Sequence, residues 1–125
     1  MIDLKKIDHI VITTKNIREC VSFYKKIGFI AKDAVTHWEL YAGDFKINVH
    51  IEEKELEPKA RFVQPGSADI CIEVNGSIEN VKRELEERGI LLETNIVMRH
   101  GAKGSMHSIY LRDSDENLIE LSSYE

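Results

Sequence analysis

The sequence predicts an α+β fold made from two copies of one strand–helix–strands module. The first copy begins DHIVITTKNIRECVSFYKKIGF at residues 8–29, and the second begins DICIEVNGSIENVKRELEERGI at residues 69–90. Each copy has a short apolar strand pattern, a polar turn, an amphipathic helix pattern and a closing glycine. Because neither half can bury its own apolar face, we expect the halves to lie side by side, with two half-sheets facing a common hollow.

The first copy predicts one helix and four strands. Residues 7–14 are rich in β-branched side chains and favour a strand. Asn16 is the expected helix N-cap, with Glu19 completing a capping box. Further strands are expected near 29–34, 38–42 and 45–51, with a hairpin turn at 43–44. The buried stripe of the helix is predicted to hold Ile17, Cys20, Val21, Tyr24 and Ile27.

The second copy repeats this plan. Residues 68–74 are the expected strand, Ser77 caps the helix, and Gly89 ends it. The buried stripe is predicted to hold Ile78, Val81 and Leu85. Strands are expected at 107–112 and 117–122, joined by a turn at 113–116. Residues 99–106 contain two glycines and no apolar periodicity, so they are expected to form a loop.

Composition fits one ordinary globular domain, residues 1–125, with modules at about 5–51 and 67–124 and a linker at about 52–66. The net charge of −5 argues against a nucleic-acid surface. No apolar run approaches the roughly 18 residues of a membrane span, and no signal-peptide segment is evident. The two cysteines are too few for a secreted disulfide framework, so reduced thiols and a cytoplasmic location are expected.

Strand alternation sorts the polar side chains. If the apolar residues of each strand pack on the helices, the opposite faces of the strands carry polar groups. Enclosing imidazoles and carboxylates there is costly unless they are paired or bind a cation. The residues expected on these faces are His9, Asn48, His50, Asp69 and Glu120.

The segments IDHIVITTKNI, FYKKIGF and SIYLRDSDENLIELSSY resemble the vicinal oxygen chelate superfamily, which includes glyoxalase I, extradiol dioxygenases and bleomycin-binding proteins. KINVH, PGSADICIE and GAKGSMHSIYLRD resemble in particular the glyoxalase domain-containing protein 5 type. The resemblance implies two βαβββ modules forming a cupped eight-stranded mixed sheet. It also implies a divalent cation in the cup and a homodimer.

The resemblance places the superfamily's metal ligands on specific positions. Its first-strand ligand falls on His9 and its last-strand glutamate on Glu120. The fifth-strand position, usually histidine, holds Asp69, and the fourth-strand glutamate of glyoxalase I is replaced by Asn48, with His50 two residues on. A histidine-plus-carboxylate set suits Mn²⁺, Fe²⁺, Ni²⁺ or Zn²⁺. Because two positions depart from the glyoxalase I set, glyoxalase I activity itself is not implied.

Each ligand candidate has a structural alternative. His9 can be an ordinary strand histidine, and Asp69 can help cap the entry to its strand. Glu120 can pair with Arg112 or Lys46 instead of a metal.

Other residues are candidates for proton transfer and substrate contact. His50 titrates near neutral pH and, with Glu73, is a candidate base, although His50 can equally be a ligand or a substrate contact. Arg99 and Lys103 suit an anionic substrate group, and Tyr110 can line the pocket. A plain mobile loop is the alternative for the segment that holds the two cations.

Three further expectations concern accessibility. Cys20 is expected in the helix core, and Cys71 is expected to face the hollow as an inert thiol. His37, near a strand end, is expected to be exposed. Strand parity does not assign Trp38 to either face.

Two functions from different classes remain. The first is a metal-dependent enzyme, lyase- or dioxygenase-like, whose small substrate binds the cation through adjacent oxygens. The second is a metal-free, bleomycin-resistance-like protein that sequesters a small aromatic or cationic compound. Both predict a small-molecule partner, and neither predicts contact with nucleic acid or membrane.

Overall fold

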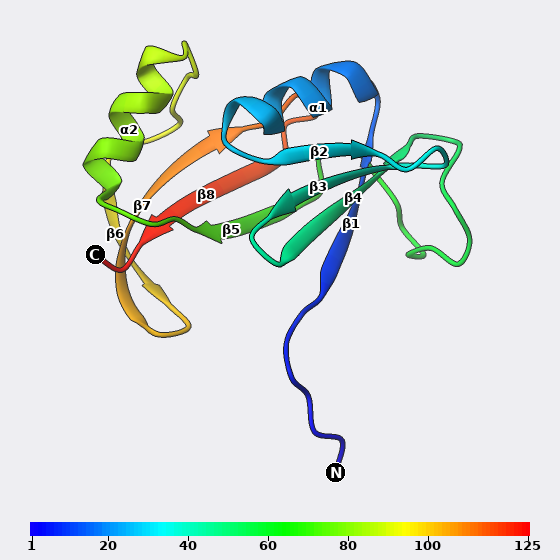
Figure 1. The fold of residues 1–125 in the computed structure, drawn as a ribbon, viewed down its shortest axis with the longest axis horizontal. Coiled ribbons are helices and arrows are strands. Elements are labelled where there is room, and N and C mark those ends of the chain that lie inside the picture. The colour runs from blue at the N-terminus through cyan, green and yellow to red at the C-terminus, as the bar shows by residue number, and fades with distance from the viewer. The chain divides into compact units, whose positions relative to one another are not determined.

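The computed structural model describes residues 1–125 and divides them into two compact units, Met1–Pro65 and Gly66–Glu125. Each unit holds one βαβββ module with a four-stranded sheet and one helix (Figure 1). In both sheets the first strand of the module runs parallel to the last, and the other pairings are antiparallel. The predicted α+β class with two βαβββ modules is confirmed.

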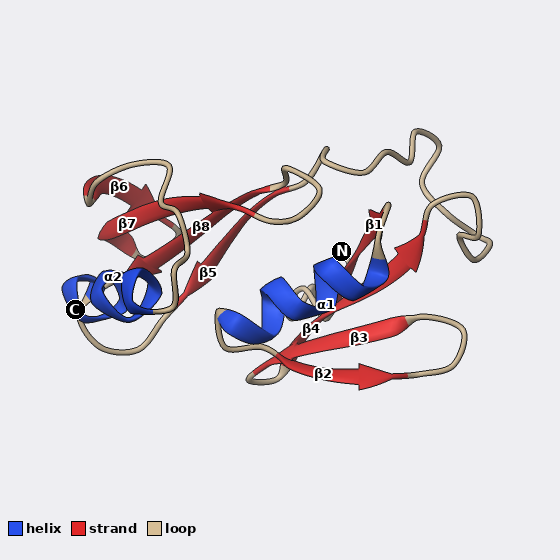
Figure 2. Cartoon of the chain, turned by 90° about the horizontal axis from the view of Figure 1, so that it is seen from above, coloured by secondary structure: helices blue, strands red, loops and turns tan.

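Unit 1 forms a sheet in the order β1-β4-β3-β2, with α1 against one of its faces (Figure 2). Its elements are β1 (His9–Thr14), α1 (Ile17–Lys26), β2 (Ile30–Asp33), β3 (Trp38–Ala42) and β4 (Phe45–Ile51). The predicted cap is confirmed, because the Asn16 side chain accepts a hydrogen bond from the Glu19 N–H at 3.1 Å. Gly43 has a φ of 60°, which the turn between β3 and β4 requires.

The core of unit 1 lies between α1 and the sheet. Cys20, Val21 and Tyr24 are buried on α1, as the stripe predicts. The Tyr24 ring meets that of Phe29 edge-on, with centroids 5.3 Å apart. The buried apolar residues of the sheet are Ile12, Leu40, Ile47 and Val49.

Unit 2 forms a sheet in the order β5-β8-β7-β6. Its elements are β5 (Asp69–Glu73), α2 (Ile78–Glu87), β6 (Val97–Gly101), β7 (Gly104–Arg112) and β8 (Leu118–Ser123). The Ser77 hydroxyl accepts from the Asn80 N–H at 3.3 Å, which confirms the second cap. Its buried apolar residues are Ile78, Leu85, Met106, Ile109, Leu111, Ile119 and Leu121.

The expected loop at 99–106 is wrong. β6 and β7 pair as a hairpin through Gly101 and Gly104, with a two-residue turn between them. β6 is an edge strand whose middle residues are exposed, so its sequence lacks the apolar alternation that marks a half-buried strand. A Cβ at Gly101 would meet the Tyr124 hydroxyl and the Met106 sulfur, so a larger residue there would force these side chains to shift.

The segment between the modules, residues 52–66, contains no helix or strand. Neither α1 nor α2 is long and apolar enough to cross a membrane.

Candidate functional site

The face of the unit 1 sheet opposite α1 carries polar side chains from three strands, and we call it the unit 1 open face. Across the β1–β4 ladder, His9 lies opposite Lys46 and Thr13 lies opposite His50. His9 is exposed, and its Nδ1 lies 2.7 Å from Asp8 Oδ1. Asn48 lies between Lys46 and His50, and its Oδ1 is buried without a hydrogen-bond partner. An unsatisfied buried acceptor is costly, and a donor or a cation would satisfy it.

A polar network on the same face centres on Glu39. Its carboxylate accepts hydrogen bonds from Lys46 Nζ at 2.6 Å and from Tyr41 Oη at 3.0 Å, and it lies 3.3 Å from His37 Nε2. The bond from Lys46, followed by that from Tyr41, lowers the Glu39 pKa to about 2. His37 is half-buried beside Glu39, so the prediction that it is exposed is wrong.

Sequence reasoning did not identify Glu39. The available signal was the alternation of β3, in which the buried Leu40 follows Glu39 and places it on the open face. Its pairing with Asn48 depends on strand register, which is not evident from the residue pattern.

His50 is a buried imidazole with one defined hydrogen bond. The Leu56 N–H donates to His50 Nδ1 at 3.4 Å, which leaves the ring proton of the neutral form on Nε2. Burial, followed by the nearby His37, lowers the His50 pKa below its usual value. At neutral pH the ring is therefore neutral, with an Nε2–H available as a hydrogen-bond donor.

The corresponding face of unit 2, the unit 2 open face, carries carboxylates and a thiol. Glu120 on β8 lies opposite Cys71 on β5 and Tyr110 on β7. The Ser122 hydroxyl donates to Glu120 Oε2 at 3.1 Å and lies 3.2 Å from Cys71 Sγ. Asp69 is exposed and makes no side-chain hydrogen bond or ion pair.

The two cations considered as alternative partners of Glu120 are each paired with another carboxylate. Lys46 pairs with Glu39 at 2.6 Å, and Arg112 pairs with Glu93 at 3.4 Å. Within unit 2, Glu120 therefore has the neutral Ser122 hydroxyl as its partner and makes no ion pair. A half-buried carboxylate in this setting is available to a ligand of positive charge.

The register that places Glu120 is fixed by the turn before β8. Asp113 Oδ1 accepts from the backbone N–H groups of Asp115 at 2.8 Å and Asn117 at 3.0 Å. The Asn117 side chain in turn accepts from the Ala68 N–H at 2.8 Å, which ties the start of β5 to that of β8. The predicted turn at 113–116 is thus confirmed, and it also aligns Asp69 and Cys71 along β8.

The cationic residues predicted to contact substrate are engaged within unit 2. Arg99 Nε donates to the Tyr110 hydroxyl at 3.0 Å, and its guanidinium lies 5.4 Å from the centroid of the same ring. Lys103 pairs with Glu73 at 3.0 Å. An anionic substrate would compete with Glu73 for Lys103, whereas Arg99 has a neutral partner.

The two thiols differ as predicted in accessibility. Cys20 is fully buried and Cys71 is exposed. Partial burial raises the Cys71 pKa, the hydrogen bond with Ser122 opposes this, and the charges of Glu120 and Asp69 raise it further. The protonated thiol, a weak nucleophile, is therefore the favoured form at neutral pH.

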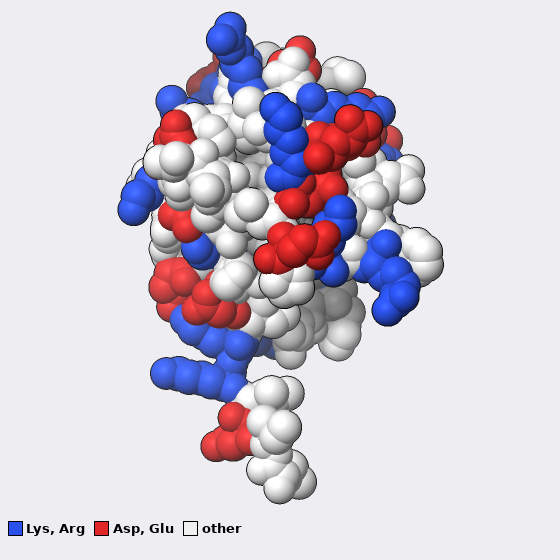
Figure 3. All heavy atoms as spheres, turned by 90° about the vertical axis from the view of Figure 1, so that its right-hand side faces the viewer, with Lys and Arg blue, Asp and Glu red and all other residues white.

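The proposed metal ligands come from both units. His9 belongs to unit 1, and Asp69 and Glu120 belong to unit 2. No group of three or more His, Cys, Asp and Glu side chains lies close enough together to hold a metal ion. The donor types, one imidazole and two carboxylates without a cationic partner, match the ligand preferences of Mn²⁺, Fe²⁺, Ni²⁺ and Zn²⁺. On the molecular face shown in Figure 3, acidic and basic side chains lie beside one another.

Comparison with known proteins places the chain in a family. The profile of the Glyoxalase/Bleomycin resistance protein/Dioxygenase superfamily matches residues 6–121. The glyoxalase domain-containing protein RDO1 of Mycosarcoma maydis is 41% identical over 125 residues, covering 99% of this chain and 71% of that protein. The virulence protein STM3117 of Salmonella typhimurium is 42% identical over 126 residues, covering 97% and 85%.

Solved structures agree. The crystal structure of STM3117 matches with a TM-score of 0.95 at 40% identity, covering 99% of this chain and 100% of that one. A lactoylglutathione lyase from Agrobacterium tumefaciens matches with a TM-score of 0.74 at 16% identity, covering 97% and 95%, and shows a common fold alone. The chain belongs to the glyoxalase/bleomycin resistance protein/dioxygenase superfamily, also called the vicinal oxygen chelate superfamily.

Proposed function

We propose that the protein is a metal-dependent enzyme of this superfamily that acts on a small molecule with two adjacent oxygen atoms. His9, Asp69 and Glu120 are the proposed metal ligands. The observation that carries the proposal is Glu120, a half-buried carboxylate whose partner is the neutral Ser122 hydroxyl. A carboxylate oxygen whose partner is a neutral hydroxyl is a ligand that a divalent ion can take. When bound, the ion supplies Lewis acidity that stabilises an enolate or oxyanion.

The remaining polar groups of the open faces would bind substrate and move protons. His50 is the first candidate base, because burial keeps its ring neutral, and Leu56 must release Nδ1 before that nitrogen can accept a proton. Glu73 is the second candidate, and Lys103 must release its carboxylate before it can act as a base. The buried Oδ1 of Asn48 would accept a hydrogen bond from a substrate hydroxyl.

Three further groups of unit 2 are proposed substrate contacts. Arg99 and Tyr110 form a hydrogen-bonded pair, and both side chains would contact the same substrate oxygen. Lys103 would join them if an anionic group displaced Glu73.

The test is thermal unfolding of tag-free, chelator-treated protein with Mn²⁺, Fe²⁺, Ni²⁺ or Zn²⁺ added in turn. Binding to the native state at a hundredfold excess over the dissociation constant adds about 2.7 kcal/mol of stability. We expect at least one ion to raise the melting temperature and a chelator to reverse the rise. Glu120→Gln keeps the side-chain shape, removes the charge and should lose most of the response. Glu86→Gln, at an exposed position on α2, is the matched control and should keep it. An unchanged response in Glu120→Gln would reject Glu120 as a ligand.

The alternative function is metal-free binding of a small cationic or aromatic compound. The observation that favours it is the amide of Asn48 at a position that holds glutamate in glyoxalase I. The acidic side chains of the unit 2 open face would then attract the compound electrostatically. Failure of all four ions to alter the melting temperature of the unmodified protein would favour this function.

The proposal includes a homodimer and membership of the glyoxalase domain-containing protein 5 type. Each sheet has two edge strands, β1 and β2 in unit 1 and β5 and β6 in unit 2, and edge strands invite pairing. The branch is proposed from the segments KINVH, PGSADICIE and GAKGSMHSIYLRD. A monomer by light scattering at micromolar concentration would remove the dimer.

A further inference from the structure

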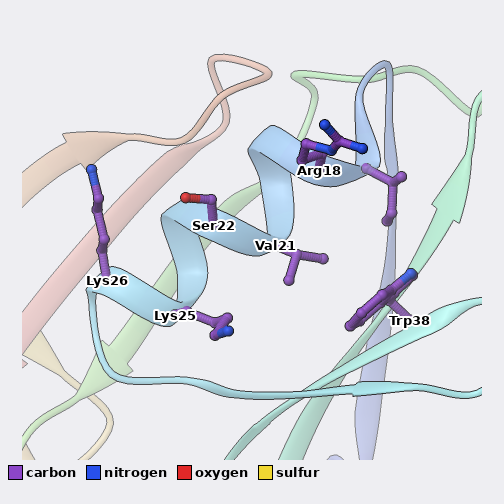
Figure 4. A pocket seen from close by; sticks show the side chains of 7 residues that line it. Arg18, Val21, Ser22, Lys25, Lys26 and Trp38 are labelled. Carbon is purple, nitrogen blue, oxygen red and sulfur yellow. The ribbon is translucent and has the colours of Figure 1, made fainter.

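A concave site lies in unit 1, on the opposite side of the sheet from His9 and His50. It is a pocket of about 660 Å³ between one flank of α1 and the side chain of Trp38 (Figure 4). Trp38 pairs with the buried Val49 across β3 and β4, which places it on the face that α1 covers. The volume falls within the range of about 300–1,000 Å³ typical of small-molecule sites.

The pocket combines an apolar wall with cations. Ile17, Val21 and Trp38 supply apolar surface, and Figure 4 shows Val21 pointing from α1 toward the side on which Trp38 lies. Arg18 and Lys25 lie about two turns apart on the same flank.

Three cations line the pocket, and two of them, Arg18 and Lys25, have no acidic partner; the third is Lys26. No Asp or Glu lines the pocket, and neither Arg18 nor Lys25 makes an ion pair or a side-chain hydrogen bond. This local excess of positive charge stands out in a chain of net charge −5. A concave surface with apolar walls and unpaired cations is complementary to an anion with an apolar body.

The corresponding flank of α2 lacks this character. Counted from the caps Asn16 and Ser77, the positions of Arg18, Val21 and Lys25 hold Glu79, Lys82 and Glu86. The two helices have the same length and similar caps, so the module itself does not dictate a cationic, apolar flank. The pocket is a property of unit 1.

We propose that this pocket binds a small organic anion with an aromatic or short aliphatic body. Arg18 and Lys25 would hold its carboxylate or sulfonate group, and Trp38 and Val21 would contact its body. The site does not depend on the proposed metal centre, because it uses the other face of the sheet and none of the same residues.

The test uses the fluorescent aryl sulfonate 8-anilinonaphthalene-1-sulfonate as the probe. Trp38 is the single tryptophan of the chain, so energy transfer from tryptophan to bound probe reports binding near this side chain. We expect saturable energy transfer that is unchanged by a chelator and weakened by added salt. Octanoate should displace the probe, and octanamide, which has the same chain without the charge, should displace it far less.

The double variant Arg18→Gln, Lys25→Gln should weaken probe binding by about tenfold or more. The matched control Lys82→Gln, Arg83→Gln removes the same charge from α2 and should bind as the unmodified protein does. Circular dichroism checks that both variants keep their fold. If the double variant does not fold, the single variant Lys25→Gln replaces it in the binding measurement.

Three results would overturn the proposal. The first is probe bound without energy transfer from Trp38, and the second is equal affinity in the Arg18, Lys25 variant and the control. The third is a Trp38 that acrylamide cannot quench, because the pocket would then be covered in solution by another part of the protein or by a second copy.

Discussion

The two units share one topology, yet their open faces carry different chemistry. Unit 1 presents imidazoles, an amide and a neutralised carboxylate, whereas unit 2 presents Asp69, Glu120 and the thiol of Cys71. The same contrast appears on the helices, since one flank of α1 is cationic and apolar while that of α2 carries Glu79 and Glu86. Shared features, such as the caps and the buried helix stripe, determine the fold. The positions that the fold leaves open are free to diverge and to divide functional roles.

The largest expected difference between the units is in the reactivity of their thiols, because Cys20 is buried and Cys71 is exposed. In chelator-treated native protein, Cys71 should react with a thiol reagent at least about a hundredfold faster than Cys20, because exposing a buried core helix costs several kcal/mol. Mass spectrometry after timed labelling identifies the modified residue. Glu120→Gln should speed the Cys71 reaction further, because the Glu120 charge helps to raise the thiol pKa. Faster labelling of Cys20 would mean that the helix and strand faces are assigned wrongly.

Glu39 in unit 1 and Glu73 in unit 2 should contribute differently to the loss of protein stability at low pH. The Glu39 pKa is lowered to about 2 from an ordinary value near 4.5, so the unfolded chain takes up this proton at a higher pH than the native protein does. The stability that Glu39 contributes is therefore complete above pH 4.5 and is lost as the pH falls toward 2. Glu39→Gln should flatten the fall in melting temperature across this window.

Glu73 in unit 2 provides the matched comparison for Glu39. It also pairs with a lysine, but its side chain is 53% exposed, against 12% for Glu39. Glu73→Gln should therefore change the fall in melting temperature at low pH much less than Glu39→Gln does, because solvent screens the pair of Glu73 with Lys103. Equal effects of the two substitutions would show that the Glu39 network is no stronger than a surface ion pair.

The helix caps should give the smallest and most similar effects. Asn16→Ala and Ser77→Ala each remove one side-chain acceptor from a helix N-terminus and should each lower the free energy of unfolding by about 1 kcal/mol. Urea denaturation measures both values, and Asn16→Asp should retain most of the stability because it keeps an acceptor. A large difference between the two alanine variants would mean that the helices are not equivalent in the two units.

Most of the fold could be predicted from local patterns, because strand alternation, the buried stripes of helices and helix caps depend on residues close together in the sequence. β6 could not, since an exposed edge strand with a glycine at its end has no buried face to mark it. The open-face residues could be predicted from alternation, but their partners could not. Lys46 was a candidate partner for Glu120 and instead binds Glu39, because the register of β3 against β4 brings Glu39 and Lys46 together.

Trp38 has a consequence for how unfolding of the protein can be followed. Each unit has its own buried apolar residues, and the only indole belongs to Met1–Pro65. Tryptophan emission therefore reports melting of the first half, whereas far-ultraviolet circular dichroism sums both helices. Coincident denaturation curves would indicate a single cooperative transition, and separated curves would indicate that the halves melt independently. The cooperativity between two duplicated halves can thus be measured with two optical signals and no added label.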